Sequence, residues 1–558
     1  MNKIKYFITL TSIALAVVIF SGLSLADDDY IYLQIMYTND THGGIAPSGA
    51  WFMNPEFPPP LGGWGSLAEY IKIRREDMKD KGAHSLLLDA GDCFTGTPIG
   101  TKTEGMAVIN AMNMLGYDAM AIGNHEFDKG YWALEKMIKT ANFPIMAANI
   151  IDSRTGKKPD HIKGYFIRDF GDLKVGIVGI GLTASPDMAL PDNIGNYDFL
   201  PEERVIADLV PDVRSQCDVL IVLTHMFLPY DPVEGWAEVE KRNEEGDPTI
   251  DGMGMHAANL FSGIDLMFTG HVHRGYYEPW EDPINHTIMC QTYGNGSGVG
   301  EIVLKIDKKT KTIAGYDLPS ESGGLVTLFE DQFPPDNEVA EYIAKEQAIA
   351  EEGMDDPIGS TRVKLVRGGA AESIIGRMIM DAFRAYYDSD FSFSNVGGVR
   401  SEIPVGDITL RQLFMVMPFG NQLVRMQVKG SFIRKIVEQK LLSDNSDRGI
   451  LTAGAEIIYN KTRPQWDRVT KFLIRGEPLD PDRIYDVVTT DYLSEGNSGL
   501  EILLEIPRDE KEYTQIPDID VVAKYITENS PINIKPDTRF KRDDNSEQAA
   551  YLKQTEYQ

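Results

Sequence analysis

The sequence predicts an α/β fold, because one pattern repeats up to about residue 320. A short apolar run rich in β-branched residues ends in a cluster of Gly, Asp, Asn or His, and a longer stretch of helical character follows. Runs that are almost continuously apolar are typical of strands buried on both faces, as in layered α/β folds. Six such runs are predicted as strands, at residues 31–36, 86–88, 119–122, 175–178, 219–223 and 266–268.

Length and composition indicate a globular protein with more than one domain. The chain has 558 residues, of which 42% are hydrophobic and 25% charged, and this length suggests about two to four domains. Its formal net charge is −30. Because phosphate backbones and anionic lipids repel such a protein, the charge argues against polymeric nucleic acid and anionic membranes as partners. The oligomeric state stays open.

Residues 1–26 are predicted to be a secretory signal peptide. Lys3 and Lys5 form a basic start, residues 7–20 are apolar, and small residues up to Ala26 fit a cleavage site. An uncleaved membrane anchor is the alternative, but the apolar run is short for a bilayer span. We therefore expect an exported protein, periplasmic or extracellular, without a stable membrane anchor.

A change of character after residue 330 predicts a domain boundary. Residues 336–352 are rich in Ala, Glu and Ile with helical spacing, and Gly353 and Pro357 end the stretch. We expect this helix to lie in an interdomain linker that acts as a hinge. The predicted division is signal peptide 1–26, first domain 27–330, helical linker 331–357, α+β second domain 358–534 and polar tail 535–558.

Five polar clusters follow predicted strands of the first domain. They contain five of the nine histidines and lie at residues 39–43, 91–92, 123–128, 224–225 and 270–273. Because a parallel sheet brings the loops after its strands to one edge, these side chains should meet there. Carboxylate and imidazole groups suit Zn, Mn, Fe or Mg, and a shared Asp can bridge two cations. Cys93 directly follows Asp92 and could add a thiolate, but the set without it is favoured.

With these motifs, the chain resembles the 5′-nucleotidase family of two-domain metallophosphoesterases, which includes periplasmic UDP-sugar hydrolases and ecto-5′-nucleotidases. The five clusters match the calcineurin-like motifs. Residues 395–400, 406–409 and 418–421 are similar to the C-terminal signatures. The resemblance implies an αββα calcineurin-like sandwich followed by an α+β substrate-binding domain.

The resemblance also implies a site with two divalent metal ions, whose identity (Zn, Mn, Co, Fe or Mg) stays open. One ion would be bound by Asp40, His42 and His273, the second by Asn124, His225 and His271, with Asp92 as the bridge. Several members have Gln or Asn where His273 stands. His125 would stabilise charge on the transferring phosphoryl group, with Asp128 orienting its imidazole.

The second domain is expected to bind the substrate. By resemblance, Arg400 contacts the phosphate, and Phe419 and Tyr492 stack on the two faces of the base, with Asn421 in the same motif as Phe419. Arg367 is a further candidate for the phosphate, although it stands five positions before Glu372 rather than three.

Two other positions depart from the family pattern. Ser498 stands where an Asp commonly holds the ribose hydroxyls, and Ile374 stands where an Asn is common. A hydroxyl accepts hydrogen bonds more weakly than a carboxylate does, so ribose recognition is the open point.

The sequence therefore predicts an exported, two-metal phosphoesterase that hydrolyses nucleoside 5′-monophosphates or related nucleotides. The alternative substrates for the same centre are 2′,3′-cyclic nucleotides, nucleotide sugars, or a sulfur ester like that of the family's thiosulfohydrolase branch. A non-enzymatic nucleotide-binding protein is less favoured, because every ligand position is filled.

Overall fold

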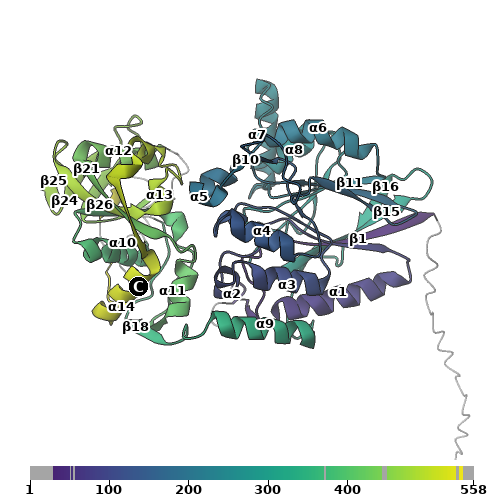
Figure 1. The fold of residues 1–558 in the computed structure, drawn as a ribbon, viewed down its shortest axis with the longest axis horizontal. Helices are drawn as coiled ribbons and strands as arrows, with labels where there is room; N and C mark the ends of the chain where they lie inside the picture. The colour runs from purple at the N-terminus through teal and green to yellow at the C-terminus, as the bar shows by residue number, and fades with distance from the viewer. Residues whose placement is uncertain are drawn as a thin grey trace, which may run out of the picture.

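The computed structural model describes residues 29–50, 52–54, 57–369, 373–442, 449–535 and 539–543. The predicted signal peptide, residues 1–26, and positions 544–558 of the predicted tail lie outside these residues. Figure 1 shows two bodies side by side, the larger built from the first part of the chain, with α9 at the base of the larger one. Within the described residues, we find no helix with the length and apolar character needed to cross a membrane.

The first domain contains two sheets. In the first, β1 (Tyr30–Thr38), β4 (His84–Asp89), β5 (Ala119–Ala121) and β6 (Ile145–Met146) run parallel, and β15 (Gly298–Asp307) and β16 (Ile313–Asp317) extend the sheet antiparallel. In the second, β9 (Lys174–Ile180), β11 (Val219–Thr224), β12 (Leu266–Phe268) and β14 (Ile288–Cys290) are parallel, with β8 (Tyr165–Asp169) and β13 (Trp280–Glu281) at the edges. All six predicted strands are therefore confirmed.

The two sheets pack face to face with helices outside. Alternate side chains of the strands, such as Leu33 and Leu86 facing Ile177 and Ile221, are fully buried in the layer between the sheets. The outer face of the first sheet is covered by α1 (Gly63–Lys79), α3 (Met106–Leu115) and α4 (Tyr131–Thr140). The second is covered by α6 (Glu202–Arg214), α7 (Pro232–Glu245) and α8 (Gly254–Leu260). The expected αββα sandwich is confirmed.

The helix expected in the linker is α9 (Asn337–Ala350), and it packs on the first domain. Its residues Val339, Ile343 and Ala350 are buried in the same core as α1 and α3. Beyond it, Glu351 and Asp355 form ion pairs with Arg411 of α11 (Leu410–Val416) in the second domain. The chain therefore passes between the domains over the short segment 351–357, after the helix.

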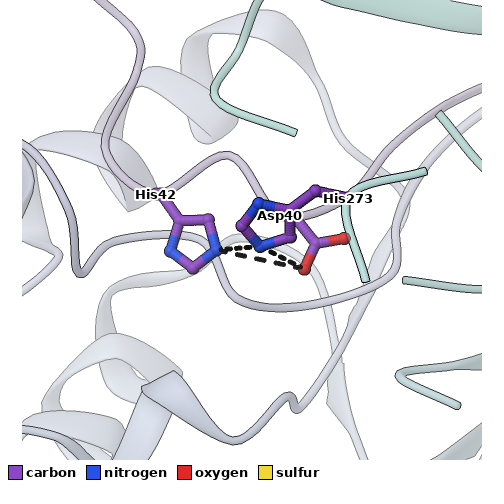
Figure 2. Close-up of side chains that lie close together, drawn as sticks. All are labelled: Asp40, His42 and His273. Carbon is purple, nitrogen blue, oxygen red and sulfur yellow. Dashed lines mark hydrogen bonds and ion pairs between the residues drawn. The ribbon is translucent and has the colours of Figure 1, made fainter. Parts of the chain in front are cut away.

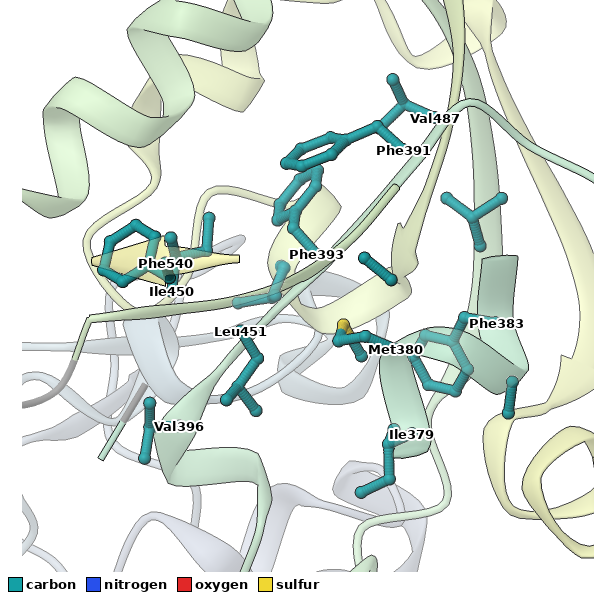
Figure 3. Close-up of a cluster of buried hydrophobic side chains, with 14 of the residues drawn as sticks. Ile379, Met380, Phe383, Phe391, Phe393, Val396, Ile450, Leu451, Val487 and Phe540 are labelled. Carbon is teal, nitrogen blue, oxygen red and sulfur yellow. The ribbon is translucent and has the colours of Figure 1, made fainter. Parts of the chain in front are cut away.

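The second domain is an α+β unit around a five-stranded sheet. The order is β22 (Ile450–Ala453), β19 (Phe391–Asn395), β26 (Ile484–Thr490), β21 (Gln422–Lys429) and β27 (Lys511–Pro517). Helices α10 (Ile374–Tyr387), α12 (Gly430–Lys440) and α14 (Asp518–Asn529) pack on it. Phe391 and Phe393 stack in its core, with ring centroids 5.9 Å apart (Figure 3).

A smaller sheet completes the second domain, with the order β25 (Glu477–Pro478), β24 (Val469–Ile474), β23 (Ala455–Tyr459) and β28 (Phe540–Arg542). Strand β28 pairs parallel with β23, and Phe540 is buried. The folded domain thus extends into the segment that the sequence analysis treats as a polar tail.

Candidate active site

The five polar clusters meet at the carboxyl ends of parallel strands. Three of them follow β1, β4 and β5 of the first sheet, and two follow β11 and β12 of the second. The sequence pattern predicts a single sheet edge, whereas both sheets of the sandwich contribute. The convergence is close, because side chains from the two sheets approach within hydrogen-bonding distance.

One group consists of Asp40, His42 and His273 (Figure 2). The Nε2 atoms of the two imidazoles are 2.8 Å apart, and Asp40 Oδ1 lies 4.0 Å from that of His42 and 3.5 Å from that of His273. The ligand atoms therefore face one another around one point, although His42 and His273 are far apart in the sequence.

The second group consists of Asp92, His225 and His271, with Asn124 beside it. His225 Nε2 is 2.8 Å from Asp92 Oδ2, and His271 Nδ1 is 3.0 Å from Asn124 Oδ1. His225 Nε2 also lies 3.8 Å from Asp40 Oδ1, which joins the two groups. All seven predicted metal ligands are thus gathered in one place.

The donor atoms fit divalent cations. His42 Nδ1 donates to the carbonyl of Thr95 and His225 Nδ1 to that of Ala90, which turns each Nε2 towards the cluster. The fully buried Nε2 of His225 faces two carboxylates, 2.8 Å from Asp92 Oδ2 and 3.8 Å from Asp40 Oδ1. Buried charged groups are paired or bind metals, and a divalent cation would suit this set of donors.

Burial affects the histidines of the cluster differently. Burial, with the charge of His225, lowers the pKa of His271 to about 3, and burial with the cation of Arg400 lowers that of His273 to about 4. These rings are neutral, as metal ligands must be. Burial would also lower the pKa of His225, but Asp92 outweighs it and raises that pKa to about 10. A cation between the two groups would replace this proton.

Five of the predicted ligands have left-handed backbone conformations. The φ angles are +50° at Asp40 and His42, +59° at Asp92, +74° at His271 and +54° at His273. Such angles are uncommon for residues other than Gly and tend to persist where the surroundings enforce them. Here the loops bond to one another, since His42 N donates to the Asp92 carbonyl and His271 N to Asp40 Oδ1.

His125 and Asp128 form a hydrogen-bonded pair at the edge of the cluster. His125 Nδ1 is 2.7 Å from Asp128 Oδ2, and its Nε2 lies 4.0 Å from Asp92 Oδ2. Burial would lower the pKa of His125, but Asp128 and then Asp92 outweigh it and raise the pKa to about 9. The imidazole is therefore a cation at neutral pH, held with Nε2 towards the cluster.

Glu126 is a residue of the site to which the sequence analysis gave no role. Its buried carboxylate accepts hydrogen bonds from the backbone N–H groups of Gly123, Asp92 and Cys93, and so joins the loops after β4 and β5. Its position inside the 123–128 cluster was the available signal. Cys93 itself is buried, and burial followed by the charge of Glu126 holds the pKa of its thiol well above the ordinary value, which disfavours a thiolate.

A cavity of about 1010 Å³ opens from the cluster towards the second domain. The five predicted substrate-binding residues all line it: Arg367, Arg400, Phe419, Asn421 and Tyr492. Asn395 ends β19 and Arg400 follows it, and Tyr492 and Ser498 follow β26, which pairs parallel with β19. The rule that places polar clusters at the carboxyl ends of parallel strands thus applies to the second domain too.

Phe419 reaches across the domain boundary. Its ring lies nearly parallel to that of His125, with centroids 5.8 Å apart, and the Arg400 guanidinium carbon is 5.7 Å from its centre. Burial, followed by the nearby cation of Arg367, lowers the pKa of Arg400, although a guanidinium stays charged in proteins. The second domain therefore contributes two arginines and an aromatic face beside the cluster of Asp and His side chains.

The two departures from the family pattern differ in position. Ser498 lines the cavity at φ +57°; its hydroxyl accepts a hydrogen bond from Asn395 Nδ2 and donates to the Tyr492 hydroxyl. Ile374 packs against the hydrophobic core of the second domain and does not appear among the described residues that line the cavity. Ser498 is therefore the departure that can touch a bound molecule.

Comparisons with known proteins agree with the two-part architecture. Residues 33–275 match the calcineurin-like phosphoesterase family, and residues 357–505 match the 5′-nucleotidase C-terminal domain family. A 5′-nucleotidase of Vibrio cholerae is 27% identical over 91% of this chain and 92% of its own length. A 5′-nucleotidase of Bos taurus is 28% identical over 89% and 88%.

Two further comparisons bear on length and fold. The endonuclease YhcR of Bacillus subtilis is 24% identical over 84% of this chain, which spans only 37% of that longer protein. The solved structure of a 5′-nucleotidase precursor from Thermus thermophilus superposes with a TM-score of 0.76 and 23% identity, covering 92% of this chain and 100% of that one. That structure supports the fold.

Proposed function

We propose that this chain hydrolyses nucleoside 5′-monophosphates or related nucleotides. It joins a calcineurin-like phosphoesterase domain to a 5′-nucleotidase C-terminal domain, and so belongs to the two-domain metallophosphoesterases of the 5′-nucleotidase type. The observation that carries the proposal is the shared cavity. One wall holds the Asp and His cluster, and the other holds two arginines and the aromatic side chains of Phe419 and Tyr492.

Two divalent cations complete the site in this proposal. Asp40, His42 and His273 would hold one, and Asn124, His225 and His271 the other, with Asp92 between them. When bound, such a pair supplies Lewis acidity to the phosphoryl oxygens and lowers the pKa of an attacking water. The fit rests on the buried, inward-facing imidazole nitrogens rather than on overall charge, because local cations set the field near such a site.

His125 would act on the transferring phosphoryl group. Asp128 accepts a hydrogen bond from Nδ1. Burial would lower the pKa of the ring, but the charges of Asp128 and Asp92 outweigh it and raise the pKa to about 9, so both nitrogens are protonated at neutral pH and Nε2 faces the cluster. A positive donor fixed at that point stabilises negative charge that develops in the transition state. Asp128 would keep the His125 ring oriented and charged during the reaction.

The second domain would hold the rest of the substrate. Arg400 and Arg367 are the cationic donors on the second-domain wall of the cleft, and they suit bidentate contact with phosphate oxygens. Phe419 and Tyr492 would stack on the base, at about 1–3 kcal/mol per stack for any base. Asn421 lines the same wall beside Phe419.

The test is phosphate release from a panel of substrates in the presence of Mn, Zn, Co or Mg. We expect release from AMP with at least one of these ions. No release from AMP, together with fast cleavage of 2′,3′-cyclic AMP or bis-p-nitrophenyl phosphate, would contradict this proposal and indicate that the substrate is a different ester.

One observation favours a second class of substrate. At the place of a common ribose-binding Asp, the Ser498 hydroxyl is already engaged by Asn395 and Tyr492. A weaker contact to the sugar keeps 2′,3′-cyclic nucleotides, nucleotide sugars and a sulfur ester as alternatives. UDP-glucose and thiosulfate esters therefore belong in the same panel.

We also propose that the protein is exported, on the signal-like sequence of residues 1–26. Mass spectrometry of protein from the native host should find a chain that begins at Asp27. A mature chain that still begins at Met1 would contradict this.

A further inference from the structure

We propose that Lys129 is a positioning residue, which holds the 418–421 loop of the second domain over His125. The proposal rests on the proposed function in one respect: it assumes that Phe419 contacts the part of the substrate beyond the phosphate. It adds a residue of the first domain that no motif singled out.

Lys129 joins the catalytic pair to the other domain. It directly follows Asp128, and its Nζ donates to the carbonyl oxygen of Phe419 at 3.5 Å. On the other side, the Asn193 amide donates to the Asp128 carbonyl at 2.8 Å, which fixes the backbone from which Lys129 extends. A shift of the Lys129 contact would therefore change the distance between Phe419 and His125.

The loop is shaped to receive the ammonium group. Gly420 has φ +70°, and a Cβ atom at that position would lie 3.1 Å from Lys129 Nζ. The positive charge therefore lies against bare backbone, where a side chain would displace it. Lys129, Phe419, Gly420 and Asn421 all line the cavity, so the contact belongs to the cleft itself.

A buried residue behind the loop, Asp518, holds the loop backbone in place. Asp518 N donates to the Asn421 carbonyl at 2.9 Å, and the Asp518 side chain is only 3% exposed. Among the described residues, its Oδ1 has no hydrogen-bond partner. Burial, followed by the charge of Asp491, raises the pKa of Asp518, and the charge of Lys129 opposes that rise. Lys129 thus contacts a loop whose backbone is also held from behind by Asp518.

The structure offers a matched control contact between the same domains. Arg508 of the second domain pairs with Asp192 of the first at 3.3 Å, but these side chains are 58% and 81% exposed. Exposed ion pairs contribute little. Removing this pair with Asp192→Asn should therefore leave the cleft unchanged.

The experiment compares Lys129→Met, Lys129→Arg and Asp192→Asn with the parent enzyme, each loaded with the same metal. We expect Lys129→Met to lower kcat/KM for AMP by about three- to fivefold, the lower end for one hydrogen bond, because the 3.5 Å contact is longer than usual. The value for p-nitrophenyl phosphate, which lacks a nucleoside for Phe419, should change by less than about twofold on the same reasoning. Lys129→Arg should recover most of the AMP activity, and Asp192→Asn should match the parent.

An equal loss on both substrates would overturn the proposal, because it would indicate damage to His125 or the metal cluster. No loss on AMP would overturn it too. If the parent enzyme cleaves p-nitrophenyl phosphate but not AMP, the proposed function fails. Small-angle X-ray scattering then tests whether Lys129 holds the two domains together. A larger radius of gyration for Lys129→Met than for Asp192→Asn would then support the contact, and equal radii would refute it.

Discussion

The two walls of the cleft are built in opposite ways. In the wall of the first domain, the predicted ligands are mostly buried, have constrained backbone angles and bond to neighbouring loops. In the wall of the second domain, Arg367 and Arg400 lie on loops and stay accessible to solvent, although the cleft reduces the hydration of the Arg400 guanidinium, and Ser498 makes weak hydroxyl contacts. We infer from this difference that the first wall determines the reaction, whereas the second wall determines which substrate binds.

The largest effect should come from the rigid wall. His125→Asn removes the cationic donor, and we expect turnover of every substrate to fall by about 10²-fold or more. Because His125 lies beside the predicted ligands and is not one of them, metal content measured by atomic emission should stay unchanged. Loss of metal in this variant, or normal turnover, would contradict the assignment and weaken the contrast between the walls.

A smaller and more selective effect is expected from the second wall. Phe419→Ala removes one stacking face, worth about 1–3 kcal/mol, so KM for AMP should rise by about tenfold. Steady-state kinetics with p-nitrophenyl phosphate should show no comparable change, since that substrate has no base to stack. If KM rises equally for both substrates, the assignment of base binding to the second wall is wrong.

Ser498→Asp sharpens the comparison further. The φ of +57° is tolerated by Asp better than by most residues, and a carboxylate forms stronger hydrogen bonds to sugar hydroxyls. The ratio of kcat/KM for AMP to that for 2′-deoxy-AMP should therefore increase by a few-fold, on the order expected for one charge-assisted bond. An unchanged ratio would show that this position does not contact the sugar.

The smallest effect concerns stability and pH. Burial, followed by the charge of Asp491, raises the pKa of Asp518 to about 8. The folded state then binds more protons than the unfolded state between the ordinary pKa of Asp and about 8, so stability should fall as pH rises through this range. Asp518→Asn should reduce the fall in Tm of the second domain between pH 5 and pH 8. A parallel pH dependence in both proteins would contradict this.

The sequence was most informative where chemistry and periodicity coincide. Near-continuous apolar runs that end in Asp, Asn or His predicted the strands of the sandwich. The same pattern predicted that the ligand candidates meet, and all seven lie in one place. What the pattern could not show was that the loops come from two sheets, because a strand's sequence does not state which sheet it joins. Glu126 was missed for a similar reason, since its three backbone donors come from loops that only the fold brings together.

The linker and the second domain were harder to predict. The helix at 337–350 has a helical pattern, but only tertiary packing reveals that Val339 and Ile343 bury against the first domain. The hinge expected of this helix therefore stays a prediction, which the segment 351–357 now fits better. Lys129 and Phe419 are 290 positions apart in the sequence, so no local spacing predicts their contact.

The most direct test of the account is metal content and phosphate release from AMP measured on one sample. The account predicts about two divalent ions per chain, loss of release when a chelator removes them, and recovery when they are added back. Release that is unaffected by complete removal of metal, or a protein that binds no divalent ion, would contradict it.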